Sequence, residues 1–462
     1  MQFDEVFIRR ALSNVSILFN SFPVNPFFSI DSRTIKEGEV FVALAGAQCD
    51  GHDFIQDAID RGAAAILICT AQQDKLEQLD QKKIKTISVV VVPDTLNTLF
   101  ELATQWRAQF SYPVIGITGS VGKTSTKELI ATILTVAGKK YLVSHGNQNT
   151  RIGTALNLLK MRKDHEVAVF EMGISCPEDM RVLANMVRPT IAVITAVGHS
   201  HMEGLGSLQD IALAKRDIFR NFTEENIGII HGDQPLLSHV SYHHPVVKFG
   251  FKTTNQIQAR KIRMVDTHAR FVLKLYKEKY NVVISKPHMG AVSNTLAAAT
   301  VGYILKIPSH FIIEAIQKPQ IVTGRFERCR LRVGSGYLIN DCYNANPESM
   351  KAALLAFEEI DTPAQKVAVI GDMLELGVNS PFWHRQIGRF VRKVPTLKKI
   401  ILVGSMVEWT KKTLPMGLEM IHVPSWQEAV DELSRITKKK ESMVLVKGSL
   451  GMGLLNLVKQ CT

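Results

Sequence analysis

A short loop with two glycines joins an apolar strand to a helix in the second quarter of this chain. Residues 112–118 (YPVIGIT) form an apolar run rich in β-branched side chains, and the run stops at Gly119. Residues 124–138 (TSTKELIATILTVAG) have the apolar spacing of a helix and end at a glycine. Strand, glycine loop and helix in this order are the local setting that a phosphate-binding loop requires.

The loop GITGSVGKTSTKE, residues 116–128, departs from the usual phosphate-loop pattern. That pattern has four residues between its first glycine and Gly-Lys-Thr, whereas only two residues separate Gly119 from Gly122. The backbone N–H groups of the loop and the helix N-terminus can still cradle an anion. Lys123 can neutralise the β- and γ-phosphates, and Thr124 can offer its hydroxyl to Mg²⁺. The alternative is a glycine-rich turn with an incidental lysine. The predicted contacts with ATP in this loop are Gly119, Ser120, Gly122, Lys123, Thr124 and Ser125.

Length and charge limit the classes of protein that fit. A chain of 462 residues is too long for one core and suggests about three domains. The formal net charge is +12, but no arginine-rich block or basic stripe with interleaved aromatic residues occurs. Basic surfaces also serve small polyphosphates and polycarboxylates, so we expect no nucleic-acid partner.

The cysteines and the apolar stretches indicate a cytoplasmic protein. None of the six cysteines forms a CxxC pair, which argues against a zinc site and against a disulfide framework. The N-terminal MQFDEVFIRR lacks the apolar run of a signal peptide. The stretches AAAILICTA and ISVVVVP are too short to span a bilayer, so we expect no membrane insertion.

Apolar strands alternate with helical stretches along the whole chain, which predicts an α/β protein with parallel sheets. The runs EVAVFEMG (166–173) and TIAVITAVG (190–198) are predicted buried strands after the loop. Four further units, each a strand that ends in polar residues, are predicted at 337–344, 366–373, 399–406 and 442–449. We expect an N-terminal α/β domain at 1–110, a central phosphate-loop ATPase domain at 111–322, and a C-terminal Rossmann-like α/β domain at 323–462.

Two side chains near strand ends suggest a metal site at the edge of the phosphate loop. Glu171 ends one predicted strand and His201 follows the next, so both belong at the carboxyl edge of a parallel sheet. Oxygen and imidazole ligands there suit a divalent ion bound to ATP. A strand-end glutamate can instead cap a helix, and His199 with His201 can form an ordinary polar loop. Lys215 follows on a predicted helix, where an exposed lysine is the ordinary alternative.

Seven motifs in a fixed order resemble the Mur ligases, the ATP-dependent amide-forming enzymes of peptidoglycan precursor synthesis. They are GITGSVGKTSTKE, GNQNTRIG (146–153), FEMG, VGHSHMEGLGSLQDIALAK, GRFE (324–327), DCYNANPESM (341–350) and GDMLELG (371–377). This family uses the short Gly-x-x-Gly-Lys-Thr loop, so the two-residue gap is compatible with ATP. The resemblance covers essentially the whole chain.

The resemblance implies a reaction and its partners. The chain is most similar to the members that join D-alanyl-D-alanine to UDP-N-acetylmuramoyl-tripeptide. The segments that carry this similarity are DSR, FVALAG, DGHDF, YNANPESM and GDMLELG with His384. The N-terminal domain would bind the UDP precursor, and the C-terminal domain would bind the dipeptide and close over ATP. The protein would act as a monomer. The alternatives are a related ligase that adds a single amino acid, a folylpolyglutamate synthetase, a non-catalytic ATP-binding protein and a nucleic-acid-dependent NTPase.

The resemblance also assigns site residues. It implies Mg²⁺ at two sites, one with Thr124 and one with Glu171, His201 and a carbamoylated Lys215. Lys123, Lys215 and His201 would be catalytic. The further nucleotide contacts would be Asn294, Arg325 and Asp341. The substrate contacts would be Asp31, Ser32, Arg33, Gly46, Asn149, Thr150, Tyr343, Asn344 and Asn346.

The sequence departs from the family pattern in three places. Gly290 and Ala291 stand where the family commonly has His-Asn, which removes a usual polar contact near the nucleotide. Thr150 replaces the second asparagine of Asn-Asn. Leu450 and Gly453 replace two arginines near the expected dipeptide end, which leaves the contacts of the acceptor carboxylate open.

Overall fold

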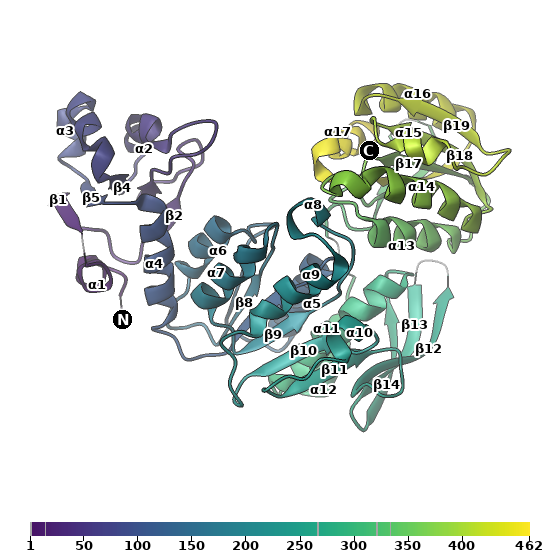
Figure 1. The fold of residues 1–462 in the computed structure, drawn as a ribbon, viewed down its shortest axis with the longest axis horizontal. Helices are drawn as coiled ribbons and strands as arrows, with labels where there is room; N and C mark the ends of the chain where they lie inside the picture. The colour runs from purple at the N-terminus through teal and green to yellow at the C-terminus, as the bar shows by residue number, and fades with distance from the viewer. Residues whose placement is uncertain (1, 14, 266–267, 320–321, 333) are drawn as a thin grey trace. The chain divides into compact units, whose positions relative to one another are not determined.

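The computed structural model describes residues 2–13, 15–265, 268–319, 322–332 and 334–462 (Figure 1). By their internal contacts these residues group into two compact units. The first unit comprises Met1–Gly116, Lys140–Gly173 and Asp179–Thr190. The second comprises Ile117–Lys139, Ile174–Glu178 and Ile191–Thr462.

The first unit is built on a five-stranded sheet with the order β1-β5-β4-β3-β2. Its strands are β1 (Ser16–Phe19), β2 (Phe28–Ser29), β3 (Val40–Val42), β4 (Ala65–Cys69) and β5 (Ser88–Val92). All neighbours pair parallel except β1 with β5. The apolar runs of β4 and β5 are almost wholly buried, as parallel strands covered on both faces require. Helices α1 (Glu5–Ala11), α2 (Ile55–Asp60), α3 (Gln81–Ile84) and α4 (Thr95–Arg107) complete this part.

The first unit also contains a parallel strand pair, β7 (Tyr141–Val143) with β8 (Val167–Glu171). The prediction of a buried strand ending at Glu171 is confirmed. Helix α6 (Arg151–Leu158) lies between the two strands in sequence and packs against α4. Helix α7 (Pro177–Val187) follows β8.

An aromatic cluster joins α1 to α4. The ring of Trp106 lies 5.1 Å from those of Phe3 and Phe7 and 5.2 Å from that of Phe110, in edge-to-face geometry. The indole Nε1 donates a hydrogen bond to the carbonyl of Met161 at 3.1 Å, so the polar atom of this buried side chain is satisfied.

Removal of the indole tests this cluster. We expect Trp106→Ala to lower the free energy of unfolding by about 3–5 kcal/mol, because it leaves a cavity and an unpaired carbonyl. Trp106→Phe should cost clearly less, since it keeps most of the apolar volume. Urea unfolding followed by circular dichroism measures both, and equal stabilities of the alanine variant and the wild type would contradict the packing account.

The central part of the second unit combines parallel and antiparallel strands. Strands β9 (Ile191–Ile194), β10 (Ile227–His231), β11 (Val246–Gly250) and β12 (Ile257–Val265) pair parallel in succession. Strands β13 (His268–Leu275) and β14 (Glu278–Ile284) then extend from β12 as an antiparallel meander. The parallel strands follow the prediction, and the meander is an addition that the sequence analysis did not contain.

Helices of the second unit's central part pack around the predicted loop. Strand β6 (Val114–Thr118) precedes the glycine loop, and α5 (Lys123–Val136) follows it, so the predicted strand–loop–helix unit is confirmed. Helix α5 packs against α11 (Met289–Ile304) and α12 (Ser309–Gln317). Helices α8 (Met202–Leu205), α9 (Leu208–Arg216) and α10 (Pro235–Ser238) lie between β9 and β11 in sequence.

The C-terminal part of the second unit is a six-stranded sheet with the order β15-β16-β20-β17-β18-β19. Its strands are β15 (Glu327–Arg330), β16 (Gly336–Asn340), β17 (Gln365–Gly371), β18 (Leu397–Val403), β19 (Glu419–Val423) and β20 (Ser442–Lys447). All neighbours are parallel except β15 with β16. All four strands predicted in this region are confirmed.

Helices cover both faces of this C-terminal sheet. One hydrophobic core includes residues of α13 (Pro347–Glu358) and α14 (Ser380–Phe390), and the other includes residues of α16 (Trp426–Lys439) and α17 (Leu454–Cys461). Helix α15 (Val407–Lys411) follows β18. The polar segments after β16, β17, β18 and β20 therefore share one edge of the sheet, where ligands of such folds bind. No helix in the described part of the chain has both the length and the apolar character needed to cross a bilayer.

Candidate active site

The phosphate-binding loop approaches its neighbours so closely that both of its glycines are required. Gly122 has φ +86° and caps α5, and a Cβ atom there would lie 2.2 Å from Oδ1 of Asn294. A Cβ atom at Gly119 would lie 2.0 Å from Oγ1 of Thr195. Any larger residue at either position would displace the loop or the residue that holds it.

The end of β9 fixes the loop through hydrogen bonds. The Ser120 N–H donates to the carbonyl of Ala196 at 2.8 Å, and the Ser120 hydroxyl donates to the carbonyl of Gly198 at 2.8 Å. The Thr195 hydroxyl donates to the carbonyl of Val121 at 2.6 Å. The loop is thus pre-organised, with the N-terminus of α5 available to an anion. The Lys123 ammonium donates to the carbonyl of Gly119 at 2.7 Å, which keeps the cation at the loop.

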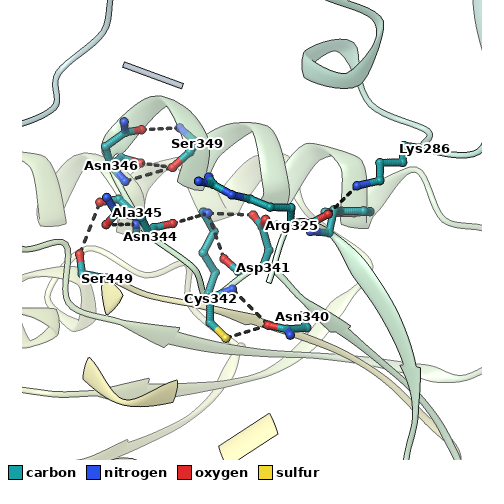
Figure 2. Close-up of polar contacts among 12 residues, drawn as sticks. Lys286, Arg325, Asn340, Asp341, Cys342, Asn344, Ala345, Asn346, Ser349 and Ser449 are labelled. Carbon is teal, nitrogen blue, oxygen red and sulfur yellow. Dashed lines mark hydrogen bonds and ion pairs between the residues drawn. The ribbon is translucent and has the colours of Figure 1, made fainter. Parts of the chain in front are cut away.

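Arg325 reaches the phosphate loop from the segment that precedes β15. Its Nη2 lies 3.3 Å from the hydroxyl of Thr124, and its guanidinium stacks 4.0 Å from the ring centre of Tyr343. The Lys286 ammonium donates to the Arg325 carbonyl at 2.8 Å (Figure 2). Stacking and hydrogen bonding together hold a permanent positive charge beside the first turn of α5.

Asp341 and Lys447 form an ion pair at the carboxyl edge of the C-terminal sheet. The Lys447 ammonium lies 2.8 Å from Oδ2 of Asp341 and also donates to the carbonyl of Asn344 at 3.0 Å. Oδ1 of Asp341 accepts the N–H of Phe326 at 3.0 Å. Figure 2 shows Asp341 beside Arg325, with Asn344 on the neighbouring turn. The lysine side chain is only 2% exposed, so its charge is held in place by these partners.

A cavity of about 250 Å³ lies beside the loop. Five of the predicted nucleotide contacts line it, namely Gly122, Ser125, Asn294, Arg325 and Asp341. Apolar side chains form another part of its wall, among them Leu129, Ile284, Ile316, Val322 and Phe326. A wall that combines a phosphate loop, fixed cations and apolar side chains suits a nucleoside polyphosphate.

Two histidines after β9 contact carboxylates of the C-terminal part of the same unit. Nδ1 of His199 lies 2.5 Å from Oε1 of Glu348 on α13, and Nδ1 of His201 lies 2.5 Å from Oε2 of Glu375. The imidazole of His201 holds the pKa of Glu375 below its usual range. The side chain of Asn346, the N-cap of α13, lies 3.5 Å from the carbonyl of Ser120. These contacts tie the C-terminal sheet to the phosphate loop.

Lys215 is a buried lysine rather than an exposed one. It lies in the last turn of α9, whose N-terminus is closed by a capping box of Ser207 and Asp210, and it is 1% exposed. Burial, followed by the nearby charge of Lys123, lowers its pKa well below the usual value for lysine. Because Lys215 is buried, the ordinary exposed-lysine interpretation is wrong. Among the described residues it forms no ion pair.

Glu171 has one carboxylate oxygen without a protein partner. Oε1 accepts a hydrogen bond from Nδ2 of Asn149 at 2.7 Å, whereas buried Oε2 has no hydrogen-bond partner among the described residues. A buried carboxylate oxygen of this kind suits a cation ligand. Thr150 is the N-cap of α6 and accepts the N–H of Gly153 at 3.3 Å, which explains how threonine serves at this position.

The described residues fit Mg²⁺ only as partial ligands. No group of three His, Cys, Asp or Glu side chains in the described part of the chain is arranged to hold a metal ion. Mg²⁺ commonly takes one or two protein oxygens together with phosphates and waters. The free oxygen of Glu171 in the first unit and the hydroxyl of Thr124 in the second each suit a single protein ligand of that kind, each within its own unit.

The predicted contacts with the UDP end lie together in the first unit. Asp31 pairs with Arg33 at 2.7 Å, and the Arg33 side chain is 82% exposed. Ser32 between them is buried. The N–H of Gly46 donates to the carbonyl of Cys49 at 2.9 Å in a neighbouring turn. Asp31 positions the exposed Arg33 guanidinium, which is accessible to an anionic substrate. The role of Arg33 stays a prediction.

Several polar residues of the site were not predicted. Lys447, Lys286 and Glu348 line the cavity but were not among the predicted nucleotide contacts. The signal for Lys447 was available, because this lysine ends an apolar strand at the same edge as Asp341. Glu348 gives no such signal, since an acid in the first turn of a helix is common.

The local structure explains why position 453 is glycine rather than the arginine of the family pattern. Gly453 has φ +69°, and a Cβ atom there would lie 2.9 Å from Cδ1 of Trp426. Both the backbone and the indole therefore require glycine. Leu450 is 47% exposed on the same loop, and a Cβ atom on the adjacent Gly451 would lie 3.0 Å from Leu374. The structure thus places apolar side chains near these two positions.

Substitution of the second loop glycine tests the geometry of the cradle. We expect Gly122→Ala to weaken ATP binding at least a hundredfold, because the new methyl group meets Asn294 and the backbone conformation is strained. Gly138→Ala is the matched control, with φ +67° and open space around the new methyl group. It should cost about 1–2 kcal/mol of stability and leave nucleotide affinity unchanged. Calorimetric titration with ATP measures both, and normal affinity in Gly122→Ala would refute the proposed cradle.

Three family descriptions match successive parts of the chain. The description "Mur ligase family, catalytic domain" matches residues 26–104, "Mur ligase middle domain" residues 117–302, and "Mur ligase, glutamate ligase domain" residues 324–450. The UDP-N-acetylmuramoyl-tripeptide–D-alanyl-D-alanine ligase of Bacillus subtilis is 30% identical over 464 residues, covering 98% of both chains. The protein of the same name from Escherichia coli is 30% identical, covering 93% of this chain and 92% of its own.

Solved structures agree with the fold. Crystal structure I of MurF from Acinetobacter baumannii superposes with a TM-score of 0.86 at 24% identity, covering 100% of this chain and 98% of its own. The MurF ligase of Thermotoga maritima in complex with ADP gives a TM-score of 0.79 at 27% identity, covering 94% of this chain and 96% of its own. The predicted three-domain α/β fold is confirmed, and with full-length relatives at 30% identity this chain belongs to the Mur ligase family.

Proposed function

We propose that this protein is the ATP-dependent ligase that joins D-alanyl-D-alanine to UDP-N-acetylmuramoyl-tripeptide and so forms the pentapeptide precursor of peptidoglycan. The observation that carries the proposal is the cavity between the phosphate loop and the cationic edge of the C-terminal sheet. The specific substrates come from the relatives, several of which carry that activity in their names and match more than 90% of this chain.

The reaction forms one amide bond at the expense of one phosphoanhydride bond. A carboxylate oxygen of the tripeptide attacks the γ-phosphorus, and the bond from that phosphorus to ADP breaks. The amine of D-alanyl-D-alanine then attacks the acyl carbon and loses a proton. The tetrahedral intermediate collapses, and inorganic phosphate leaves with the oxygen that the carboxylate supplied.

Two anions must meet in the first step, so fixed positive charge has to stand beside them. Lys123, held at the loop by the carbonyl of Gly119, is placed to follow the γ-phosphoryl group as it moves. Arg325 stacks on Tyr343 and donates a hydrogen bond to the Thr124 hydroxyl, so it supplies a second cation beside the N-terminus of α5. Fixed cations of this kind need no reorganisation when negative charge develops.

We propose Mg²⁺ at two positions, with Thr124 at one and Glu171 and His201 at the other. Bound Mg²⁺ would neutralise the phosphate oxygens and the carboxylate. The unpartnered Oε2 of Glu171 supports this assignment. The Nδ1 of His201 already contacts Glu375, which leaves Nε2 for a ligand.

We propose that Lys215 is carbamoylated in the active enzyme. A lysine that is 1% exposed and forms no ion pair among the described residues would bury an uncompensated charge if it were protonated, and its lowered pKa favours the neutral amine. Addition of CO₂ to the neutral amine, with loss of one proton, gives a carboxylate. That group would remove the repulsion from Lys123 and could ligate a cation.

The remaining assignments concern the substrates and the setting. We propose that Asp31, Ser32, Arg33 and Gly46 contact the uridine end, and that Asn149, Thr150, Tyr343, Asn344 and Asn346 contact the rest of the precursor or the dipeptide. The loop with Leu450 and Leu374 would offer the dipeptide an apolar surface in place of two arginines. We also propose that the enzyme acts as a monomer in the cytoplasm.

A matrix of substrates tests the proposed reaction. Phosphate release from ATP is measured with precursors of one to three amino acids, crossed with D-alanyl-D-alanine, single amino acids and no acceptor. We expect turnover only with the tripeptide precursor and the dipeptide together, and a loss of at least a thousandfold in Lys123→Ala. Turnover with a shorter precursor and a single amino acid would move the protein to another step of the pathway. No turnover despite ATP binding would refute the enzymatic proposal.

Removal of Lys215 tests the carbamate. We expect Lys215→Ala to lower kcat at least a hundredfold while ATP affinity stays within about threefold, because the side chain is not part of the cavity wall. Added short carboxylates such as acetate or propionate should restore part of kcat, since they can replace the carbamate. Lys163→Ala, which removes an exposed lysine, is the control and should be neutral. Wild-type kcat in Lys215→Ala would contradict the carbamate proposal.

A further inference from the structure

His288 occupies a place in the nucleotide cavity that neither the family motifs nor the predicted site contains. It is the N-cap of α11, and its Nδ1 accepts the N–H of Ala291 at 3.0 Å. Because Nδ1 is an acceptor, the single proton of the neutral ring lies on Nε2. Burial lowers the pKa of this histidine to about 4, so the ring is neutral above that pH.

The second ring nitrogen is an available hydrogen-bond donor. His288 lines the cavity, and among the described residues its Nδ1 has a hydrogen-bond partner whereas its Nε2 has none. The ring of Phe326 packs against it at 5.2 Å, and the hydrogen bond from Ala291 fixes its rotation. The donor is therefore held rigidly at the wall of a cavity that we assign to a nucleotide.

A fixed acceptor accompanies this donor. Asp341 lines the same cavity and lies within electrostatic range of His288, as do Lys286 and Lys447. Each carboxylate oxygen of Asp341 accepts one protein hydrogen bond, from Phe326 and from Lys447, and retains a further lone pair. A neutral donor and an anionic acceptor that line the same cavity match a hydroxyl group, which both accepts and donates.

The other parts of the nucleotide have their own partners. The loop and the N-terminus of α5 suit the phosphates, and the apolar side chains of Leu129, Ile284, Ile316 and Val322 suit the base. The ribose is the part that carries hydroxyl groups.

We propose that His288 donates through Nε2–H to a ribose hydroxyl of ATP, whose own proton goes to Asp341, and that this pair selects ribonucleotides over deoxyribonucleotides. The inference rests on the proposed binding of ATP. It also accounts for Gly290 and Ala291, because the N-cap residue of the same helix supplies the polar contact that these positions have lost.

Titration of the wild type and of His288 variants with ATP and its deoxy analogues tests the contact. The full-length protein is titrated by calorimetry with ATP, 2′-deoxyATP and 3′-deoxyATP in the presence of Mg²⁺. His288→Ser keeps an N-cap side chain but removes the long donor, and His288→Asn keeps both a cap and a donor. His310→Ser, which removes an exposed histidine in the first turn of α12, is the matched control.

We expect the wild type and His310→Ser to bind one of the deoxynucleotides about a hundredfold more weakly than ATP, because that nucleotide loses both the hydrogen bond from His288 and the one to Asp341. In His288→Ser that ratio should fall about tenfold, since only the hydrogen bond to Asp341 remains, while ATP binds about tenfold more weakly than to the wild type. His288→Asn should recover part of the ratio.

Three results would overturn the inference. The wild type could bind all three nucleotides equally, His288→Ser could keep the wild-type ratio, or it could lose affinity equally for all three, as a merely structural role predicts. Any of these with ATP still bound to the wild type overturns the ribose contact alone. Absence of ATP binding to the wild type overturns the proposed function as well.

Discussion

The contact between Gly122 and Asn294 is the constraint on which the nucleotide site depends. It brings the N-terminus of α5 against α11 with no space for a side chain, and the two helices then pack along their length. Thr195 and Ser120 hold the other side of the loop to the end of β9. The anion-binding N–H groups are thus set by backbone packing before any ligand arrives, which is the pre-organisation that electrostatic stabilisation of a phosphoryl group requires.

The C-terminal sheet completes this site with charge. Its carboxyl edge carries the ion pair of Asp341 and Lys447, and the segment before it carries Arg325. Contacts of His199 with Glu348 and of His201 with Glu375 join the same sheet to the loop after β9. Sequence segments about two hundred residues apart therefore meet around one cavity, as a reaction that must exclude water from an acyl phosphate would require.

Sequence reasoning reached the elements whose signal is local. The strand, loop and helix around Gly122 and the four C-terminal strands follow from apolar periodicity, and their positions agree with the structure. The meander of β13 and β14 was missed, because its half-buried strands carry charged residues on the open face. Burial of Lys215 was not predictable from its helix, since a lysine in the last turn of a helix is usually exposed. His288 was missed because its role depends on the tertiary position of an N-cap rather than on a motif.

The central claim is that the γ-phosphoryl group is transferred to a carboxylate of the precursor. The most direct measurement uses UDP-N-acetylmuramoyl-tripeptide labelled with ¹⁸O in its terminal carboxylate, with unlabelled ATP, water and D-alanyl-D-alanine. Mass spectrometry of the released phosphate then reports the origin of its oxygen. The account predicts one ¹⁸O atom in each phosphate released during product formation. Unlabelled phosphate, which hydrolysis of ATP by water would give, would contradict it.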